Sequence, residues 1–302
     1  MRGSVTRVDV LNLWVEGPML KPIALIETHM ECRFLKETIP VLTDLLAFEI
    51  VSEGDGQVRV KHPNTDWLLI VHEGGPAAPD KQMLNHYGVR VASRKEVDAA
   101  HEYLTAHQAE YGLHQIGRPS YSHGSYSLYF LEPGTNGWEI ECYEDALKKG
   151  KEWEHLGSVY APHWERPLPP ERFSGRGYVP QAFTHGTLAC GEKSVSACFY
   201  TEVLGLDIFH PNNRAMYLKA PKTKCYVVSA IRESWKRFSP NFCFTLSVES
   251  AEAVTEAHRW LADTGQDLGV TGLGELRGNG AVSFFVSDPD GNWWEITSRT
   301  AR

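Results

Sequence analysis

The chain has 302 residues, which is long enough for two domains that each bury a core of their own. Its 42% hydrophobic and 23% charged residues are typical of a folded globular protein and argue against wholesale disorder or a fibrous repeat. The formal net charge is −8 and there is no basic tract, so we expect no nucleic-acid partner.

No apolar run approaches the roughly 18 residues that a membrane-spanning helix needs, so we expect no membrane insertion. Near the N-terminus Asp9 and Glu16 interrupt any apolar core of a secretion signal. The six cysteines include no C-x-x-C pair, and most lie in apolar strand-like segments, as reduced thiols do. We therefore expect a cytoplasmic protein.

Hydrophobic periodicity divides the first half of the chain into two similar units. The first opens with a strand at 24–31 and an amphipathic helix at 34–46. The second repeats this order with a strand at 84–91 and a helix at 94–109. The remaining strands are expected at 48–51, 57–61 and 67–72 in the first unit and near 113–117, 126–131 and 137–143 in the second.

The second half of the chain repeats the first. The sequence Trp-Glu-Ile at 138–140 recurs at 294–296, and Thr-His at 28–29 recurs at 184–185, both at an offset of 156 residues. The sequence therefore predicts an α+β protein of four βαβββ units paired into two similar domains. The units begin with the strands at 24–31, 84–91, 183–190 and 241–248.

The repeat sets the expected domain boundaries. We expect an N-terminal arm at 1–20, an N-terminal domain at 21–145 and a C-terminal domain at 181–302. Residues 146–180 between them are rich in lysine and proline and indicate an irregular linker. Trp153 and Trp164 in this linker indicate that it packs on a surface, although a simple tether is an equal alternative.

Strand alternation gathers polar side chains on common faces in the first half. His29 and His86 each lie in a first strand, Arg90 shares the face of His86, and Glu139 and Glu141 share a face of a last strand. Imidazoles and carboxylates lining a closed pocket are costly unless they bind a metal or one another. Two histidines and one carboxylate leave three positions open on divalent iron, enough for a bidentate substrate and dioxygen.

The stretch from Leu128 to Glu139, with Tyr129, Glu132 and Pro133, resembles the signature of the type I extradiol ring-cleavage dioxygenases. In that signature a tyrosine precedes an acidic residue and a proline, and a glutamate follows the proline by six residues. Paired βαβββ units resemble the vicinal oxygen chelate superfamily, which has the glyoxalase/bleomycin resistance/extradiol dioxygenase fold. The resemblance covers nearly the whole chain.

The resemblance implies a site in the N-terminal domain. Its metal ligands would be His29, His86 and Glu139, holding Fe(II), with Mn(II) as an alternative. Tyr129 would hydrogen-bond a substrate oxygen, and His72 would stand where the family has its acid–base histidine.

Two further positions bear on this implied site. The resemblance places His123 beside the substrate, although its gap of four residues to Leu128 is one shorter than the family's usual minimum. Glu141 is either a backup metal ligand or a carboxylate that is solvated or paired with an arginine, for which Arg90 is the candidate.

In the second half His185 and Glu295 are kept, but other site residues change. We therefore expect the C-terminal domain to be mainly structural. A zinc site formed by His185, Cys243 and Glu295 is the alternative. The changed positions are Cys243 for His86, Phe285 for Tyr129 and Val228 for His72.

The activity that the resemblance implies is extradiol cleavage, in which Fe(II) and O2 open a catechol-type ring beside its two hydroxyls. The expected partners are a small aromatic diol and O2, and a hydroquinone or aminophenol is an alternative substrate. A homo-oligomer is expected because it is the common outcome for soluble enzymes. Two other functions stay open, a glyoxalase-type metal-dependent isomerase and a metal-free small-molecule-binding protein of the same fold.

Overall fold

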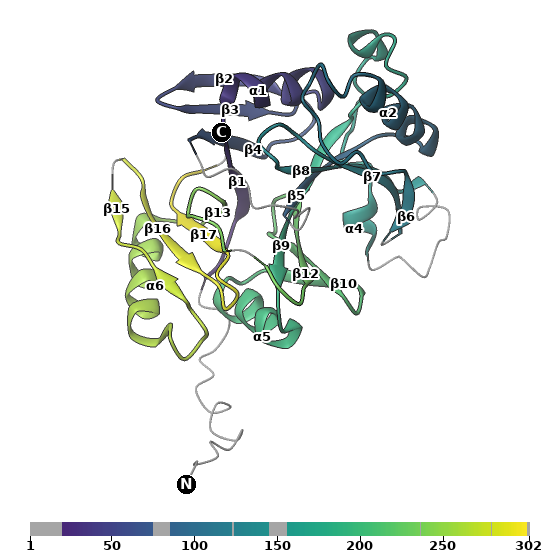
Figure 1. The fold of residues 1–302 in the computed structure, drawn as a ribbon. Helices are drawn as coiled ribbons and strands as arrows, with labels where there is room; N and C mark the ends of the chain where they lie inside the picture. Colours follow the sequence, from purple (N-terminus) through teal and green to yellow (C-terminus); the bar gives the residue numbers. More distant parts are fainter. Residues whose placement is uncertain are drawn as a thin grey trace.

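The computed structural model describes residues 20–74, 85–122, 124–144, 156–235, 237–278 and 280–300. They form two mixed β-sheets flanked by helices (Figure 1). The predicted α+β fold of four βαβββ units in two similar domains is confirmed. Within the described part of the chain, no helix is both long and apolar enough to cross a membrane.

The first two units come from the N-terminal half of the chain. The first contains β1 (Ala24–Cys32), α1 (Leu35–Pro40) with a wider helical turn (Val41–Leu45), β2 (Glu49–Gly54), β3 (Gln57–Lys61) and β4 (Leu68–Glu73). The second contains β5 (His86–Arg90), α2 (Arg94–Ala106), β6 (Ser120–Ser122), β7 (Ser125–Leu131) and β8 (Gly137–Cys142).

The third and fourth units follow a connecting segment with two short helical turns, α4 (Gly157–Tyr160) and a 3-10 turn (Pro170–Phe173). The third contains β9 (Ala182–Cys190), α5 (Lys193–Cys198) with a wider turn (Phe199–Val203), β10 (Asp207–Asn212), β11 (Ala215–Lys219) and β12 (Tyr226–Ile231). The fourth contains β13 (Cys243–Ser247), α6 (Ala251–Thr264), β14 (Gly272–Leu273), β15 (Arg277–Gly278), β16 (Val282–Ser287) and β17 (Trp293–Thr297).

One predicted strand is wrong. Residues 113–117 do not form a strand, and only His114 makes an isolated bridge, to Leu131. Gln115 has a φ of 48°, in the left-handed region, which interrupts an extended backbone. The edge of this sheet is formed instead by β6.

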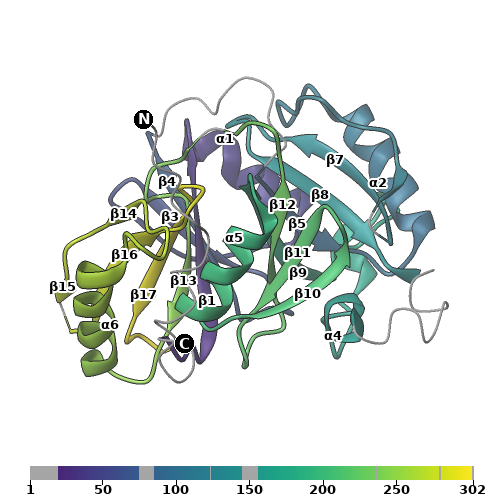
Figure 2. The same cartoon turned by 90° about the horizontal axis from the view of Figure 1, so that it is seen from below.

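The two sheets do not follow the two halves of the sequence. One sheet, here called sheet A, has the strand order β14-β16-β17-β13-β1-β4-β3-β2, with β15 paired to β16. The other, sheet B, has the order β10-β11-β12-β9-β5-β8-β7-β6. Sheet A therefore joins the first unit to the fourth, and sheet B joins the second to the third, side by side in Figure 2. The domains expected at 21–145 and 181–302 describe the repeat in the sequence, but both sheets run across that division.

Antiparallel seams join the halves, β1 with β13 in sheet A and β5 with β9 in sheet B. The seam of sheet B needs a glycine at position 186. A Cβ on Gly186 would lie 2.8 Å from Phe244 and 3.0 Å from Tyr87, closer than carbon atoms pack. The missing side chain therefore lets aromatic rings of both sheets close over the seam.

A cluster of aromatic side chains ties the four units together. Trp67 lies nearly parallel to Phe183 at 4.7 Å between ring centroids, and Phe244 lies 5.9 Å from Trp67. Phe48 contacts both Phe183 and Trp138 edge-on. Burying a phenylalanine contributes about 1.5–3 kcal/mol. Because these rings come from all four units, the two halves share one hydrophobic core.

A buried carboxylate ties down the turn before the last strand in each half. Glu132 accepts hydrogen bonds from Thr38 Oγ1 at 2.7 Å and from Asn136 Nδ2 at 2.6 Å. Asp288 accepts hydrogen bonds from Tyr200 at 2.7 Å and from the side chain and backbone of Asn292. Each turn is thus bonded to a helical segment of the preceding unit. Burial raises the pKa of Asp288 to about 6, although these hydrogen bonds oppose it.

The stability of the protein should carry a pH dependence that comes from Asp288. A carboxyl whose pKa rises from 3.8 to about 6 on folding stabilises the folded state less as the pH rises through that range. Relative to Asp288→Asn, the wild-type chain should therefore lose about 1–2 kcal/mol of unfolding free energy between about pH 4.5 and 7.5. Urea unfolding at both pH values measures this, with Asp263→Asn at an exposed position of α6 as the control. A gap between wild type and Asp288→Asn that does not change with pH would contradict the assignment.

Candidate metal centre

A single cross-strand row of sheet B collects the polar residues of the centre. Tyr129 on β7 pairs with Glu139 on β8, and Glu139 pairs with Gly88 on β5. Across the seam Gly88 pairs with His185 on β9, which in turn pairs with Tyr226 on β12. Side chains of one row project from the same face of a sheet. The row therefore brings residues from both halves of the chain together.

Gly88 at the centre of the row makes this convergence possible. A Cβ at this position would fall on the imidazole ring of His185. Any side chain there would push the ring away from Glu139. The glycine is thus required by close approach, since the ring of His185 occupies the space of the missing side chain.

His86, two residues before Gly88, completes a group of three. Oε2 of Glu139 lies 3.2 Å from Nε2 of His86 and 3.2 Å from Nε2 of His185. Ligand atoms about 2.1 Å from one metal lie about 3.0–3.4 Å apart at angles between 90° and tetrahedral. All three residues are largely buried. His86, Glu139 and His185 therefore fit a divalent metal.

The charges of this group depend on one another. Burial alone would raise the pKa of Glu139, but the hydrogen bonds of His185 and His86 outweigh it and hold the pKa well below its usual value. Burial alone would lower the pKa of His185, but the carboxylates of Glu141 and Glu139 raise it to about 9. Without a metal, an imidazolium on His185 neutralises the carboxylate of Glu139. A metal bound at Nε2 of His185 displaces that proton.

Further hydrogen bonds hold side chains of this group in place. The hydroxyl of Tyr129 donates to Oε1 of Glu139 at 2.7 Å. Oγ1 of Thr184 lies 3.1 Å from Nδ1 of His185. Outer partners of this kind fix the direction of a ligand's lone pair and are a regular part of metal sites. The tyrosine that the sequence singled out is therefore next to the candidate metal.

A second group of possible ligands lies in sheet A. Carboxylate and imidazole atoms of Glu27, His29 and Glu295 come within 4.8 Å of one another. Arg299 Nη2 lies 2.7 Å from Glu27 Oε2 and 2.6 Å from Glu295 Oε2, and Arg59 Nη2 lies 2.6 Å from Glu27 Oε1. The two guanidinium groups already supply the positive charge that these carboxylates need. This group is the weaker candidate for a metal.

The structure separates the ligand set that the resemblance implied. His86 and Glu139 lie together, with Tyr129 beside them, as expected. His29 is on β1 in sheet A, and the third member of the group in sheet B is His185 from the other half of the chain. The seam between β5 and β9 is the reason, because it places the first strand of the third unit beside the second unit.

Of the other residues that the resemblance implied, His72 lies apart from the centre. His72 is on β4 in sheet A, where its Nε2 is 2.9 Å from Nδ1 of His29. His123 lies outside the described residues. Glu141 is paired with Arg90 at 2.7 Å, which confirms the arginine-paired interpretation of that carboxylate.

The sequence repeat gave a misleading alignment for the first strands. Glu27 lies in the cross-strand row of Glu295, and His185 lies in the row of Glu139. Glu27, and not His29, is therefore the structural equivalent of His185. The Thr-His match aligns His29 with His185 at an offset of 156 residues, whereas the strand register aligns Glu27 with His185 at an offset of 158 residues. The similar segments Thr43-Asp44-Leu45-Leu46 and Thr201-Glu202-Val203-Leu204 match at an offset of 158 residues, and this was the signal in the sequence that could have revealed the alignment.

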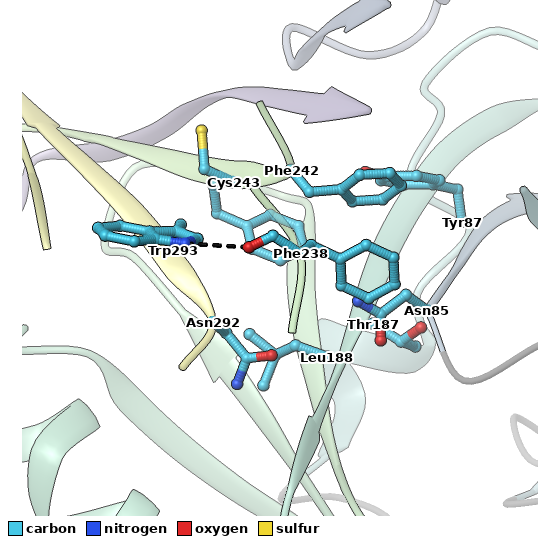
Figure 3. A pocket seen from close by; sticks show the side chains of 10 residues that line it. Asn85, Tyr87, Thr187, Leu188, Phe238, Phe242, Cys243, Asn292 and Trp293 are labelled. Atoms are coloured by element: carbon cyan, nitrogen blue, oxygen red, sulfur yellow. Dashed lines mark hydrogen bonds between the residues drawn. The ribbon is translucent and has the colours of Figure 1, made fainter. Parts of the chain in front are cut away.

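Two hollows lie near these groups. Figure 3 shows a pocket at the junction of the sheets, where Trp293 Nε1 donates to the carbonyl of Phe238 at 3.1 Å and Tyr87 lies opposite. Its volume of about 10 Å³ admits at most one water molecule, so it is no substrate site. A cleft of about 490 Å³ lies beside the group in sheet A and is lined in part by Glu27 and Arg299.

Comparisons with known proteins agree with the fold. Residues 182–296 match the family model described as Glyoxalase/Bleomycin resistance protein/Dioxygenase superfamily. A candidate dioxygenase from Bacillus subtilis is 10% identical over 92% of this chain and 86% of its own, with a TM-score of 0.57. Glyoxalase I from Zea mays is 13% identical over 91% of this chain and 92% of its own, also with a TM-score of 0.57. No curated protein matches the sequence significantly. The family match covers the C-terminal half, and the structural likeness extends the fold to both halves.

Replacing a single histidine should distinguish the two groups. His185→Ala removes one of the three proposed ligands. A complete protein site binds its metal with a free energy of about 10–16 kcal/mol, so the loss of one ligand should cost on the order of 3 kcal/mol of binding free energy, or about 100-fold in metal affinity. His29→Ala, the matched control on β1, should leave the affinity unchanged. Titration of Mn(II) or Co(II) against a chromophoric chelator measures both. Weaker binding in His29→Ala with normal binding in His185→Ala would move the metal to sheet A.

Proposed function

We propose that the chain is a metal-dependent extradiol-type dioxygenase that acts on a small aromatic diol, with the metal held by His86, Glu139 and His185. The observation that supports this is the convergence of two imidazoles and one carboxylate, 3.2 Å apart, on one face of sheet B. Fe(II), or Mn(II), bound to such a set supplies open positions for a bidentate diol and for dioxygen.

Glu139 and Tyr129 have defined tasks in this proposal. Glu139 contributes the one negative charge among the three ligands, so the occupied centre stays positive and favours a diol that has lost a proton. Burial raises the pKa of Tyr129, which therefore stays a neutral hydroxyl and a hydrogen-bond donor. It is partly exposed on the same face as Glu139, where it can hold a substrate oxygen beside the metal.

A glyoxalase-type isomerase is the second candidate, and one observation favours it. The acid–base histidine of the resemblance, His72, lies in sheet A. By strand register the position of His72 corresponds to Ala230 on β12 in sheet B. Among the described residues of the centre, alanine therefore occupies the position at which the extradiol dioxygenases of the resemblance have their acid–base histidine. An isomerase that moves a proton with a carboxylate does not need it.

Dioxygen uptake tests the proposal. Anaerobically purified chain loaded with Fe(II) should consume O2 in the presence of a catechol and form a yellow ring-opened product. His185→Ala should reduce the rate by at least about 100-fold, in line with the lost metal affinity, and His29→Ala should retain it. An oxygen electrode and absorbance spectra measure both quantities over a panel of catechols, hydroquinones and aminophenols.

The same preparation separates the alternatives. Bound metal without O2 uptake, together with anaerobic conversion of a hemithioacetal of an α-ketoaldehyde, would replace the dioxygenase by the isomerase. Tight binding of small aromatic molecules without bound metal or turnover would replace both by the binding protein.

A further inference from the structure

The connecting segment packs onto the same face of sheet B as the metal centre. Leu156, Val159 and Tyr160 are buried there, and the ring of Tyr160 stacks on Tyr143 at 4.3 Å between centroids. Figures 1 and 2 both show α4 against sheet B. The segment Leu156–His163, here called the strap, is thus part of the structure around the centre and is more than a tether.

Arg90 on β5 binds the strap through its backbone. Its Nη1 donates to the carbonyl of Val159 at 3.0 Å and also to the carbonyl of Ala161. The side chain is 1% exposed and its guanidinium lies over the ring of Tyr143, 4.4 Å from the centroid. A buried guanidinium is tolerated only when its donors are satisfied. The strap carbonyls therefore belong to what keeps Arg90 in place.

Glu141 connects Arg90 to a metal ligand. Its Oε1 accepts hydrogen bonds from Nε and Nη2 of Arg90 at 3.1 Å and 2.7 Å. The same Oε1 lies 3.6 Å from Nδ1 of His185 and accepts a hydrogen bond from Thr184 at 2.9 Å. Nε2 of His185 faces Glu139 and the metal position. One carboxylate oxygen thus stands between the guanidinium that binds the strap and the imidazole that would bind the metal.

We infer that Arg90 and Glu141 are positioning residues that couple the docking of the strap to metal binding at His185. The inference depends on the metal site proposed above and not on the reaction performed there. Glu141 faces Nδ1 of His185 and also accepts a hydrogen bond from Thr184, whose Oγ1 lies 3.1 Å from that Nδ1, so the carboxylate and the hydroxyl together hold the imidazole with Nε2 toward the metal position. Arg90 holds Glu141, and the strap holds Arg90. Because coupling between two binding events is reciprocal, bound metal also stabilises the docked strap.

The arrangement gives the centre a closed end and an open end. The strap, Arg90 and Tyr143 fill the face of sheet B beyond Glu141. Tyr129 and Val228, which project beside the ligands, are only partly buried. A substrate would therefore reach the metal from the side of these two residues, and the strap limits how far it extends in the other direction.

A pair of isosteric substitutions tests the role of Glu141. Glu141→Gln removes the charge that faces Nδ1 of His185 and should weaken Co(II) binding about 10–100-fold and shift the visible spectrum of bound Co(II). Glu132→Gln is the matched control, because Glu132 is a carboxylate buried to the same degree but bonded to a turn. It should lower stability and leave both Co(II) readouts unchanged. Equal Co(II) affinity and spectrum in wild type and Glu141→Gln would overturn the inference.

A second pair of substitutions changes the packing of the strap and measures the effect on Co(II) binding. Leu156→Ala loosens the strap without touching a ligand, and Leu104→Ala in α2 is a control of equal burial. Leu156→Ala should weaken Co(II) binding several-fold, whereas Leu104→Ala should not. In wild type, Co(II) should slow amide hydrogen exchange within 156–163, and Glu141→Gln should abolish that protection.

Two results would overturn the coupling. One is an unchanged Co(II) affinity in Leu156→Ala although faster amide hydrogen exchange within 156–163 shows that the strap no longer packs on sheet B. The other is no Co(II) effect on strap exchange in wild type at saturation. Failure of the wild-type chain to bind Co(II) would overturn both the metal site and the coupling. Normal Co(II) results without O2 uptake would count only against the proposed reaction.

Discussion

The antiparallel pairing of β5 with β9 is the contact on which the candidate centre depends. It builds sheet B from the second and third units, so the two histidines of the centre come from strands on either side of one seam. Gly88 in that seam leaves room for His185 to reach Glu139. If the second unit paired with the first instead, His86 and Glu139 would have no partner from β9. The choice of seam therefore determines which histidine completes the group.

The sequence was sufficient for the repeat, the four units and two of the three grouped residues. His86 and Glu139 could be predicted because they belong to one unit, where strand alternation fixes their common face. The third residue of the group, His185, could not be predicted, because two similar units offer equivalent edges and the local sequence pattern does not say which edge pairs. Glu132 shows a second limit, since it fits a catalytic signature by spacing while its carboxylate bonds Thr38 and Asn136 in a turn.

The two sheets neutralise buried carboxylates in different ways. In sheet A, Arg299 bridges Glu27 and Glu295, so two carboxylates are balanced by guanidinium groups of the chain. In sheet B, Arg90 balances Glu141, whereas the described partners of Glu139 are the hydroxyl of Tyr129 and the imidazoles of His86 and His185, with no guanidinium among them. A buried carboxylate without a fixed cation costs several kcal/mol. A divalent metal held by His86, Glu139 and His185 would remove that cost in sheet B, whereas in sheet A it would compete with an arginine already in place.

The pairing of the second unit with the third also explains why the strap lies beside the candidate metal centre. Because sheet B contains the second and third units, the segment between them starts and ends on the same sheet. Its first part, Leu156–His163, packs on the face of that sheet, where Arg90 binds it through two backbone carbonyls. Its later part contacts the first unit, where Arg172 Nη1 donates to Glu49 Oε1 at 3.0 Å and Tyr178 donates to the carbonyl of Leu45 at 3.1 Å. The pairing that brings His86, Glu139 and His185 together is thus the pairing that brings the strap beside them.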